Sequence, residues 1–267
     1  MMAERDLGGQ LEKMQREWDE RARENARFYV NTERQDWTDA DFFRSGERTV
    51  SEEILTDMIN ICQGKDPKRM RVLEIGCGAG RVTRALAQIF GEVYGVDISG
   101  EMVRQARAAL ADAPNVHIFR NSGKDLDVLG STRVDFAFSS IVFQHIPSRE
   151  VIESYVRAVR RRLRRGGLFK FQLQGGEFDN PPDDTWLGVT FSERQARDMA
   201  VRCGFEMRYS YGAGTQYFNL WYFNPRFLSA AWRQHREHQL RVAYMRLRAR
   251  GGGLWRSLKG RINSFTC

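Results

Sequence analysis

Residues 69–90 read RMRVLEIGCGAGRVTRALAQIF, and this stretch decides the fold. Three glycines, Gly76, Gly78 and Gly80, fall within five positions between two apolar runs. Glycine disfavours both strand and helix, so its repetition at a junction indicates that something approaches the bare backbone. In an α/β sheet, a glycine-rich turn after the first strand usually lies against a nucleotide. A tight turn without a ligand is the alternative.

Outward from this stretch, apolar strand-like runs alternate with amphipathic segments of helical period. Such alternation predicts a parallel sheet with helices on both faces, a Rossmann-like α/β fold in three layers. No helix separates the last two strands, so the final strand of this seven-stranded sheet is expected to run antiparallel. Strands are predicted at 71–75, 92–97, 116–119, 134–139, 168–173, 205–210 and 216–222, and helices at 80–90, 100–111, 149–164 and 193–203.

Two capping signals mark predicted helix starts. Ser192 with Gln195 fits a capping box, and Gly204 is a plausible end for the helix that it opens. Thr49 with Glu52 fits the same pattern and predicts a helix that begins there and runs through residue 61. Residues 31–49 then form an aromatic-rich connector after a first helix at 10–29.

Composition limits the classes of protein that this chain can belong to. Its 267 residues, 42% of them hydrophobic, suit one large domain with appendages. No segment is apolar for long enough to cross a bilayer, and the first residues lack the apolar core of a signal peptide. The four cysteines are scattered, which favours a reducing, cytoplasmic location over a disulfide framework or a zinc site. No metal site is expected, since His235 and His238 lack a third ligand.

The positive charge is concentrated at the carboxyl end. The net charge is +8, and residues 223–267 hold ten Lys or Arg and one acid, so the rest of the chain is almost neutral. Apolar residues there fall mostly at helical spacing, which predicts a basic amphipathic tail. Docking on its own domain or in a homodimer is the first interpretation, peripheral contact with the inner membrane face the second, and nucleic acid the third.

Four segments resemble the motifs of class I S-adenosylmethionine (SAM)-dependent methyltransferases of the small-molecule type. They are VLEIGCGAGRVT, VYGVDIS, VDFAFSSIVFQHI and LRRGGLFKFQ, in order over residues 71–223. Arg81 stands where a dinucleotide fingerprint has its third glycine, which disfavours a pyrophosphate ligand. The resemblance implies domains at 1–66 (helical cap), 67–223 (SAM-binding) and 224–267 (basic helical tail).

The resemblance also implies how the cofactor is held. Glu74 would hold its ammonium, Asp97 would accept both ribose hydroxyls, and Ile98 would pack on the adenine. For Asp97 the alternative is a helix N-cap, which Ser99 could supply instead. The loop after strand three departs from the usual Gly-Asp. The implied cofactor-binding residues are Glu74, Gly76, Cys77, Gly78, Gly80, Asp97, Ile98, Ser122, Gly123 and Gln144, for SAM and its product S-adenosylhomocysteine.

A methyl acceptor that is a neutral hydroxyl must lose a proton, and His145 at the end of strand four is placed to take it. A packing histidine bonded to a loop carbonyl is the alternative. Candidate acceptor contacts are Tyr29, Trp37 and Phe43 in the amino-terminal cap, and Glu177, Asp179 and Trp186 after strand five; core filling and a solvated loop are their alternatives.

These patterns predict methyl transfer from SAM to an oxygen of a small molecule, a saccharide or a lipid-linked glycan. The alternatives are an RNA methyltransferase, or a membrane- or nucleic-acid-binding protein that keeps a degenerate methyltransferase domain.

Overall fold

The computed structural model describes residues 7–176 and 185–225. The chain divides into two compact units, residues 1–226 and 227–267, and the described residues all belong to the first. The predicted basic tail beyond residue 225 therefore lies outside the described residues, as do Glu177, Asp179, His235 and His238.

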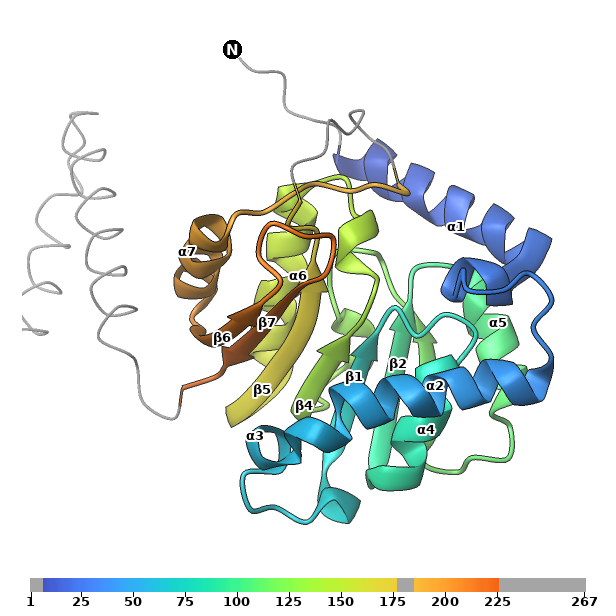
Figure 1. Ribbon diagram of the computed structural model, residues 1–267, viewed down its shortest axis with the longest axis horizontal. Helices are drawn as coiled ribbons and strands as arrows, with labels where there is room; N and C mark the ends of the chain where they lie inside the picture. The colour runs from blue at the N-terminus through green and yellow to red at the C-terminus, as the bar shows by residue number, and fades with distance from the viewer. Residues whose placement is uncertain (1–6, 177–184, 226–267) are drawn as a thin grey trace, which may run out of the picture. The chain divides into compact units, whose positions relative to one another are not determined.

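A seven-stranded sheet forms the middle layer, in the order β3-β2-β1-β4-β5-β7-β6 (Figure 1). The pairs β1–β2, β2–β3, β1–β4 and β4–β5 are parallel, whereas β7 runs antiparallel to both β5 and β6. The predicted seven strands and the antiparallel last strand are thus confirmed. The strands are β1 (Arg71–Ile75), β2 (Glu92–Asp97), β3 (Val116–Arg120), β4 (Val134–Ser139), β5 (Leu163–Leu173), β6 (Glu206–Tyr211) and β7 (Phe218–Phe223).

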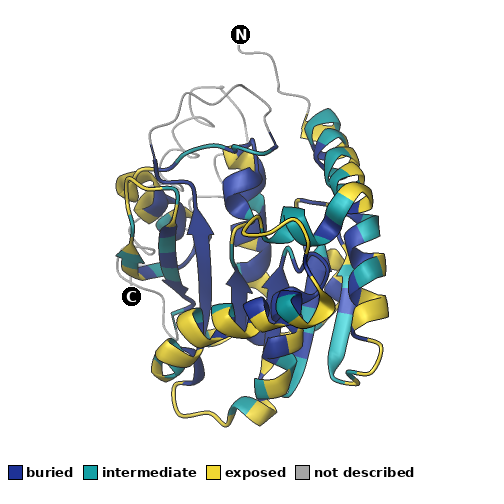
Figure 2. Cartoon of the chain, turned by 45° about the vertical axis from the view of Figure 1, so that its right-hand side comes forward, coloured by how far each residue is buried: buried dark blue, intermediate teal, exposed yellow. Residues whose placement is uncertain are grey.

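Helices cover both faces because successive strand residues point to opposite sides. In β4, Phe136 and Phe138 join the core beneath α2 and α4, while Ala137 between them joins the core beneath α6 and α7. Every residue of β4 is buried, as expected for a central parallel strand (Figure 2). The helices are α2 (Asp39–Glu53), α4 (Arg81–Ile89), α5 (Gly100–Ala109), α6 (Arg149–Arg162) and α7 (Glu193–Cys203).

One predicted capping box is confirmed and the other is wrong. Ser192 and Gln195 bond reciprocally at the start of α7, and Gly204 ends that helix in the left-handed conformation. Helix α2 instead begins after Thr38, whose hydroxyl oxygen accepts from the Asp41 amide at 3.1 Å. Thr49 lies inside α2 and donates back to the Ser45 carbonyl at 3.2 Å. The earlier cap starts the helix about three turns before the predicted position; beyond it follow a 3₁₀ turn (Leu55–Asp57) and α3 (Met58–Cys62).

The amino-terminal helix α1 (Leu7–Val30) contacts the core of the sheet and the start of α5. It is interrupted at Asn25, whose backbone is not helical. Leu11 and Met14 enter the same core as the sheet residues. The Asp19 carboxylate accepts from the Ser99 hydroxyl at 2.6 Å and from the Glu101 amide at 3.1 Å, so α1 caps the start of α5. This contact holds α1 near the carboxyl end of β2.

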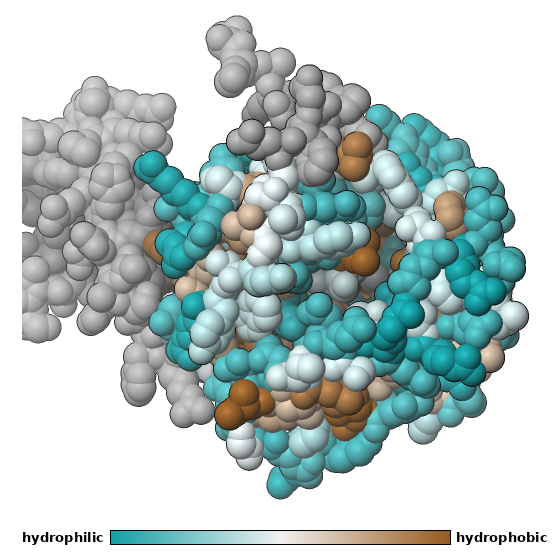
Figure 3. Space-filling model, viewed as in Figure 1, coloured by the Kyte–Doolittle hydropathy of each residue, from teal (hydrophilic) through white to brown (hydrophobic). Residues whose placement is uncertain are grey.

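The surface carries an apolar patch away from the strand carboxyl ends. Figure 3 shows apolar side chains gathered near α3, where Leu55 and Ile59 are 50% and 84% exposed. No described helix is both long and apolar enough to span a bilayer. Cys62, Cys77 and Cys203 are buried as free thiols.

Candidate active site

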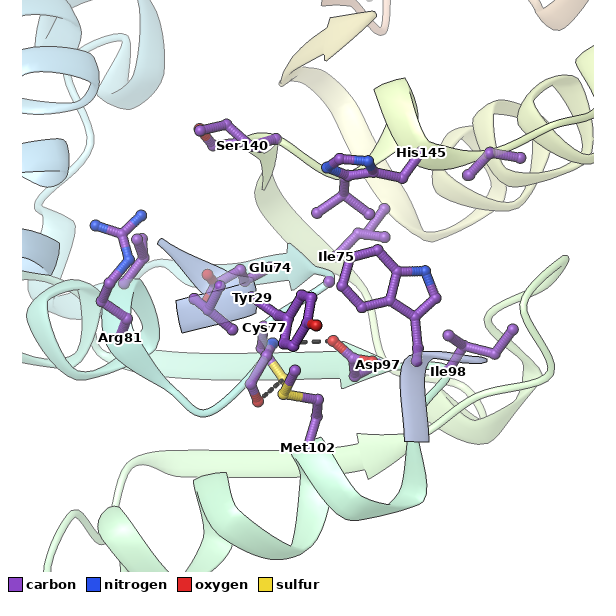
Figure 4. A pocket seen from close by; sticks show the side chains of 18 of the residues that line it. Tyr29, Glu74, Ile75, Cys77, Arg81, Asp97, Ile98, Met102, Ser140 and His145 are labelled. Atoms are coloured by element: carbon purple, nitrogen blue, oxygen red, sulfur yellow. Dashed lines mark hydrogen bonds between the residues drawn. The ribbon is translucent and has the colours of Figure 1, made fainter. Parts of the chain in front are cut away.

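The strand order reverses between β1 and β4, and a pocket lies at this point. In open α/β sheets, ligands bind outside the carboxyl ends of the strands where the order reverses. The empty space in the pocket, with its open mouth included, is about 890 Å³. Its lining comprises Met14, Trp18, Tyr29, Val30, Glu74, Ile75, Gly76, Cys77, Gly78, Arg81, Val82, Asp97, Ile98, Met102, Ser140, Ile141, Val142, His145, Ile146 and Tyr155 (Figure 4).

The glycine loop forms one wall of the pocket. Gly76 and Gly78 have φ of 71° and 51°, in the left-handed region that favours glycine. A Cβ on Gly76 would clash with the Val142 methyl groups, and one on Gly78 would lie 2.6 Å from Val30 Cγ2. Gly80 lies outside the lining and caps α4 with φ of 87°. Two of the three glycines therefore line the pocket. Both must lack a side chain because Val142 and Val30 lie so close to them.

A buried carboxyl group, Glu74, and a buried arginine, Arg81, are among the residues that line the pocket beside this loop. Glu74, 5% exposed, accepts from the Thr83 hydroxyl at 2.5 Å. Burial raises the pKa of the Glu74 carboxyl to about 8, although the Thr83 hydrogen bond and the Arg81 charge act to lower it.

Arg81, 7% exposed, donates from Nη1 to the Ser45 carbonyl and to the Thr49 hydroxyl, each at 2.9 Å. Its Nε–H is buried and has no hydrogen-bond partner. A buried donor without a partner is unfavourable, and Arg81 is also one of the residues that line the pocket. The pocket wall beside the glycine loop therefore includes one acidic and one basic residue.

Asp97 ends β2 at the centre of the pocket. Its carboxylate accepts from the backbone amides of Gly78 and Ser99, each at 2.9 Å. Burial raises the pKa of Asp97 to about 6, and these two hydrogen bonds act to lower it. The Ser99 hydroxyl accepts from the Met102 amide at 3.1 Å, so Ser99 is the side-chain N-cap of α5. Asp97 is thus left with its carboxylate in the pocket wall, next to Ile98.

The loop after β3 contributes to the pocket only indirectly. Ser122 is exposed and accepts from the Asp125 amide at 3.3 Å, and Gly123 packs behind Ile98. Neither residue lines the pocket. Tyr155 of α6 does, and the Asn121 side chain donates to its hydroxyl at 2.8 Å.

His145 lies in the 3₁₀ turn Phe143–His145 that follows β4, on the opposite side of the pocket from Met102 (Figure 4). The side chain is 7% exposed, and Nδ1 lies 2.6 Å from the Trp186 carbonyl oxygen. The Trp18 ring meets the imidazole edge-on at 5.4 Å, and the Trp186 ring lies 5.2 Å away. His145 therefore lines the pocket, as a proton acceptor must, and also bonds a loop carbonyl, as a packing histidine would.

The other predicted residues divide between the pocket and its surroundings. Tyr29 lines the pocket, and Trp186 lies behind His145 outside the lining. Trp37 and Phe43 pack in the core with α2, where the Trp37 indole donates to the Asn31 carbonyl at 2.8 Å. Gln144 is buried beside His145 but outside the lining.

Several lining residues were not predicted as site residues. Trp18 and Met14 were recognisable on the apolar face of α1, and Arg81 follows the glycine loop directly. Tyr155 carries no local signal, because it reaches the pocket from the middle of α6. Within 7–176 and 185–225, no three His, Cys, Asp or Glu side chains gather as a metal ion would need.

Comparison with known proteins gives one family match. Residues 72–167 match the model of the methyltransferase domain family. A tRNA/tmRNA (uracil-C(5))-methyltransferase of Campylobacter hominis is 30% identical over 129 residues, 44% of this chain and 34% of that protein. A ubiquinone biosynthesis O-methyltransferase of Methylobacterium nodulans is 28% identical over 112 residues, 40% of this chain and 44% of that protein. The chain thus spans less than half of the length of these curated relatives.

Solved structures share the fold. DhpI, solved with S-adenosylhomocysteine, superposes with a TM-score of 0.56 at 18% identity, over 82% of this chain and 99% of DhpI. The magnesium protoporphyrin IX methyltransferase ChlM of Synechocystis, also solved with S-adenosylhomocysteine, gives 0.56 at 17% identity, over 79% of this chain and 97% of ChlM.

Proposed function

We propose that this protein, whose residues 72–167 match the methyltransferase domain family and whose fold is shared with DhpI, transfers a methyl group from SAM to an oxygen of a small-molecule acceptor. One observation carries the proposal. The lining of one pocket, at the reversal of strand order, includes a buried acid, a buried arginine, a carboxylate at the end of β2, and a histidine.

The polar side chains match the polar parts of SAM. Glu74 would bind the ammonium of the amino-acid arm, and the positive charge of Arg81 would favour its carboxylate. Asp97 would accept from the ribose hydroxyls, and Ile98 would pack on the adenine. SAM supplies a methyl group already activated on a sulfonium, so the protein needs mainly to position the acceptor.

The side of the pocket near His145 would receive the acceptor. It is apolar and aromatic, with Trp18, Tyr29 and Ile146 in the lining. These side chains suit a flat or apolar body that presents one hydroxyl, and they offer few partners for the many hydroxyls of a saccharide or lipid-linked glycan. The His145 imidazole would take the proton that the hydroxyl loses, and α1 above it would exclude water.

Calorimetry with S-adenosylhomocysteine tests cofactor binding. Wild type and the exposed control Asp112→Ala should bind alike, whereas Asp97→Ala should bind at least ten-fold more weakly, since a charged hydrogen-bonding group contributes about 1.5–3 kcal/mol. The cofactor assignment is wrong if wild-type protein that is folded by circular dichroism gives no binding heat.

Transfer of label from methyl-labelled SAM to a panel of phenols, saccharides and amines then tests the acceptor. We expect label on phenolic hydroxyls, and expect His145→Phe to keep cofactor affinity while losing transfer. Transfer to amines but not to hydroxyls would refute the oxygen assignment.

RNA is the second candidate acceptor. Two of the matched relatives are named for RNA substrates, the tRNA/tmRNA enzyme above and a probable ribosomal RNA methyltransferase of Methanopyrus kandleri. The cluster of basic residues in 223–267 would suit a polyanion. Affinity for RNA should then fall steeply with salt, and a flat salt profile would exclude it.

A further inference from the structure

Two buried glutamine side chains connect to the His145 imidazole through successive polar contacts. Gln172 in β5 and Gln144 after β4 are each 4% exposed. Gln172 Nε2 lies 2.6 Å from Gln144 Oε1, and Gln144 Nε2 lies 3.3 Å from His145 Nε2. On the other side of the ring, Nδ1 lies 2.6 Å from the Trp186 carbonyl oxygen.

Backbone groups fix the orientation of the Gln172 amide. Its Oε1 accepts from the Ile141 N–H at 3.2 Å, and its Nε2 donates to the Gln216 carbonyl at 3.0 Å. A backbone N–H can only donate and a carbonyl can only accept, so a flipped Gln172 amide would lose both bonds. Its second Nε2 hydrogen therefore points at Gln144 and needs an acceptor there, which makes the facing atom Gln144 Oε1.

The orientation of the Gln144 amide in turn fixes which nitrogen of the His145 imidazole carries the proton. With Oε1 facing Gln172, Gln144 presents its NH₂ group to His145 Nε2, which must then hold a lone pair. The Trp186 carbonyl independently requires a proton on Nδ1. Both sides of the ring thus select the same neutral tautomer, protonated on Nδ1.

We infer that Gln172 and Gln144 are positioning residues that keep Nε2 of His145 as the proton-accepting atom. The inference rests on the proposed function only in naming what Nε2 accepts, the proton of the acceptor hydroxyl. The 3.3 Å contact from Gln144 is longer than the usual 2.9–3.0 Å, whereas the Trp186 bond is short. An entering hydroxyl would therefore displace the Gln144 N–H from Nε2 while the ring stays anchored through Nδ1.

Gln172 also holds the neighbouring pocket wall. Ile141, whose N–H it accepts, has φ of 55°, a strained conformation for a β-branched residue. Ile141 lines the pocket between β4 and the His145 turn. One side chain of β5 thus fixes both the backbone after β4 and, through Gln144, the histidine that follows.

Nitrogen NMR of protein labelled with ¹⁵N-histidine tests this arrangement without any acceptor or cofactor. The chain has four histidines, and His145→Phe assigns the signal of interest by its loss. In wild type at a pH where the imidazole is neutral, Nδ1 should show the resonance of a protonated ring nitrogen and Nε2 that of an unprotonated one. A proton on Nε2 in wild type would overturn the inference.

Gln172→Glu, which does not contact His145, provides the sharper test. A carboxylate cannot donate, so the Gln144 amide should turn its NH₂ group toward residue 172 and its oxygen toward His145. Nε2 should then gain a proton while Nδ1 keeps the one that it donates to the Trp186 carbonyl, so the ring should become an imidazolium at a pH where the wild-type ring is neutral, and both nitrogens should show the protonated resonance. The same substitution at exposed Gln88 is the control and should leave the signal unchanged.

Gln144→Glu places a carboxylate directly against Nε2 and should have the same effect if Gln172→Glu does not fold. An unchanged Nε2 signal in a folded variant would refute the inference that Gln172 and Gln144 set the protonation of His145. Absence of methyl transfer in every variant and in wild type would instead refute the proposed function and leave these signals as predicted.

Discussion

Binding of S-adenosylhomocysteine at pH 7 should release close to one proton, and Glu74 should be its source. Burial raises the pKa of Glu74 to about 8, so about 0.9 of this carboxyl is protonated at pH 7 before the ligand binds. A ligand ammonium favours the ionised form, because an opposite charge in contact lowers a carboxyl pKa. Asp97, with a pKa of about 6, adds only about 0.1 proton at pH 7 but about 0.9 at pH 5, if the ribose hydroxyls hold it ionised.

Calorimetry in phosphate and in Tris measures this release, because the two buffers differ in ionisation enthalpy. The slope of observed enthalpy against buffer enthalpy gives the number of protons released, which should rise from about one at pH 7 to nearly two at pH 5. In Glu74→Gln the slope at pH 7 should fall almost to zero.

Glu101→Gln is the matched control, since the Arg104 hydrogen bond lowers the pKa of Glu101 to about 2 and it holds no proton to release. Equal enthalpies in both buffers for wild type, or an undiminished slope in Glu74→Gln, would refute the reasoning.

Glu74, Gly78 and Asp19 each give a further prediction. Burial raises the pKa of Glu74 above its value in the unfolded chain, so the contribution of Glu74 to stability is complete below pH 4.5 and is lost as the pH rises through about 8. The melting temperature of Glu74→Gln should therefore fall less than that of wild type between pH 5 and pH 9. Gly78→Ala should cost more than the roughly 1–2 kcal/mol of its left-handed backbone, because its Cβ would also lie 2.6 Å from Val30 Cγ2, and it should abolish cofactor binding. Gly64→Ala, with open space around it, should cost only the backbone strain and bind normally; urea unfolding and calorimetry distinguish the two variants. Asp19→Ala should destabilise by about 1 kcal/mol and speed S-adenosylhomocysteine release in stopped flow, as α1 loses its hold on α5, with exposed Glu20→Ala unchanged; equal off-rates would count against α1 as a cover.

The sequence by itself determined the sheet and the position of the pocket. Strand and helix periods, the glycines after β1 and the Ser192 cap are local signals, set by backbone geometry within a few residues. The parallel order then places Gly78, Asp97 and His145 at one edge, because successive crossovers return each strand in the same direction. The cap at Thr49 was predicted wrongly because Thr38, eleven residues earlier, starts the helix first, and the capping pattern does not rank two candidates.

Only the tertiary structure decided how the side chains meet at that edge. Trp18 and Tyr155 reach the pocket from helices far apart in the chain, and Trp37 turns into the core although it shares the cap with Tyr29. The tautomer of His145 depends on Gln172 through Gln144, and Gln172 reaches Gln144 only because β4 and β5 pair in the sheet. Such convergence follows from long-range packing and from the matching of donors to acceptors, neither of which leaves a periodic trace in the sequence.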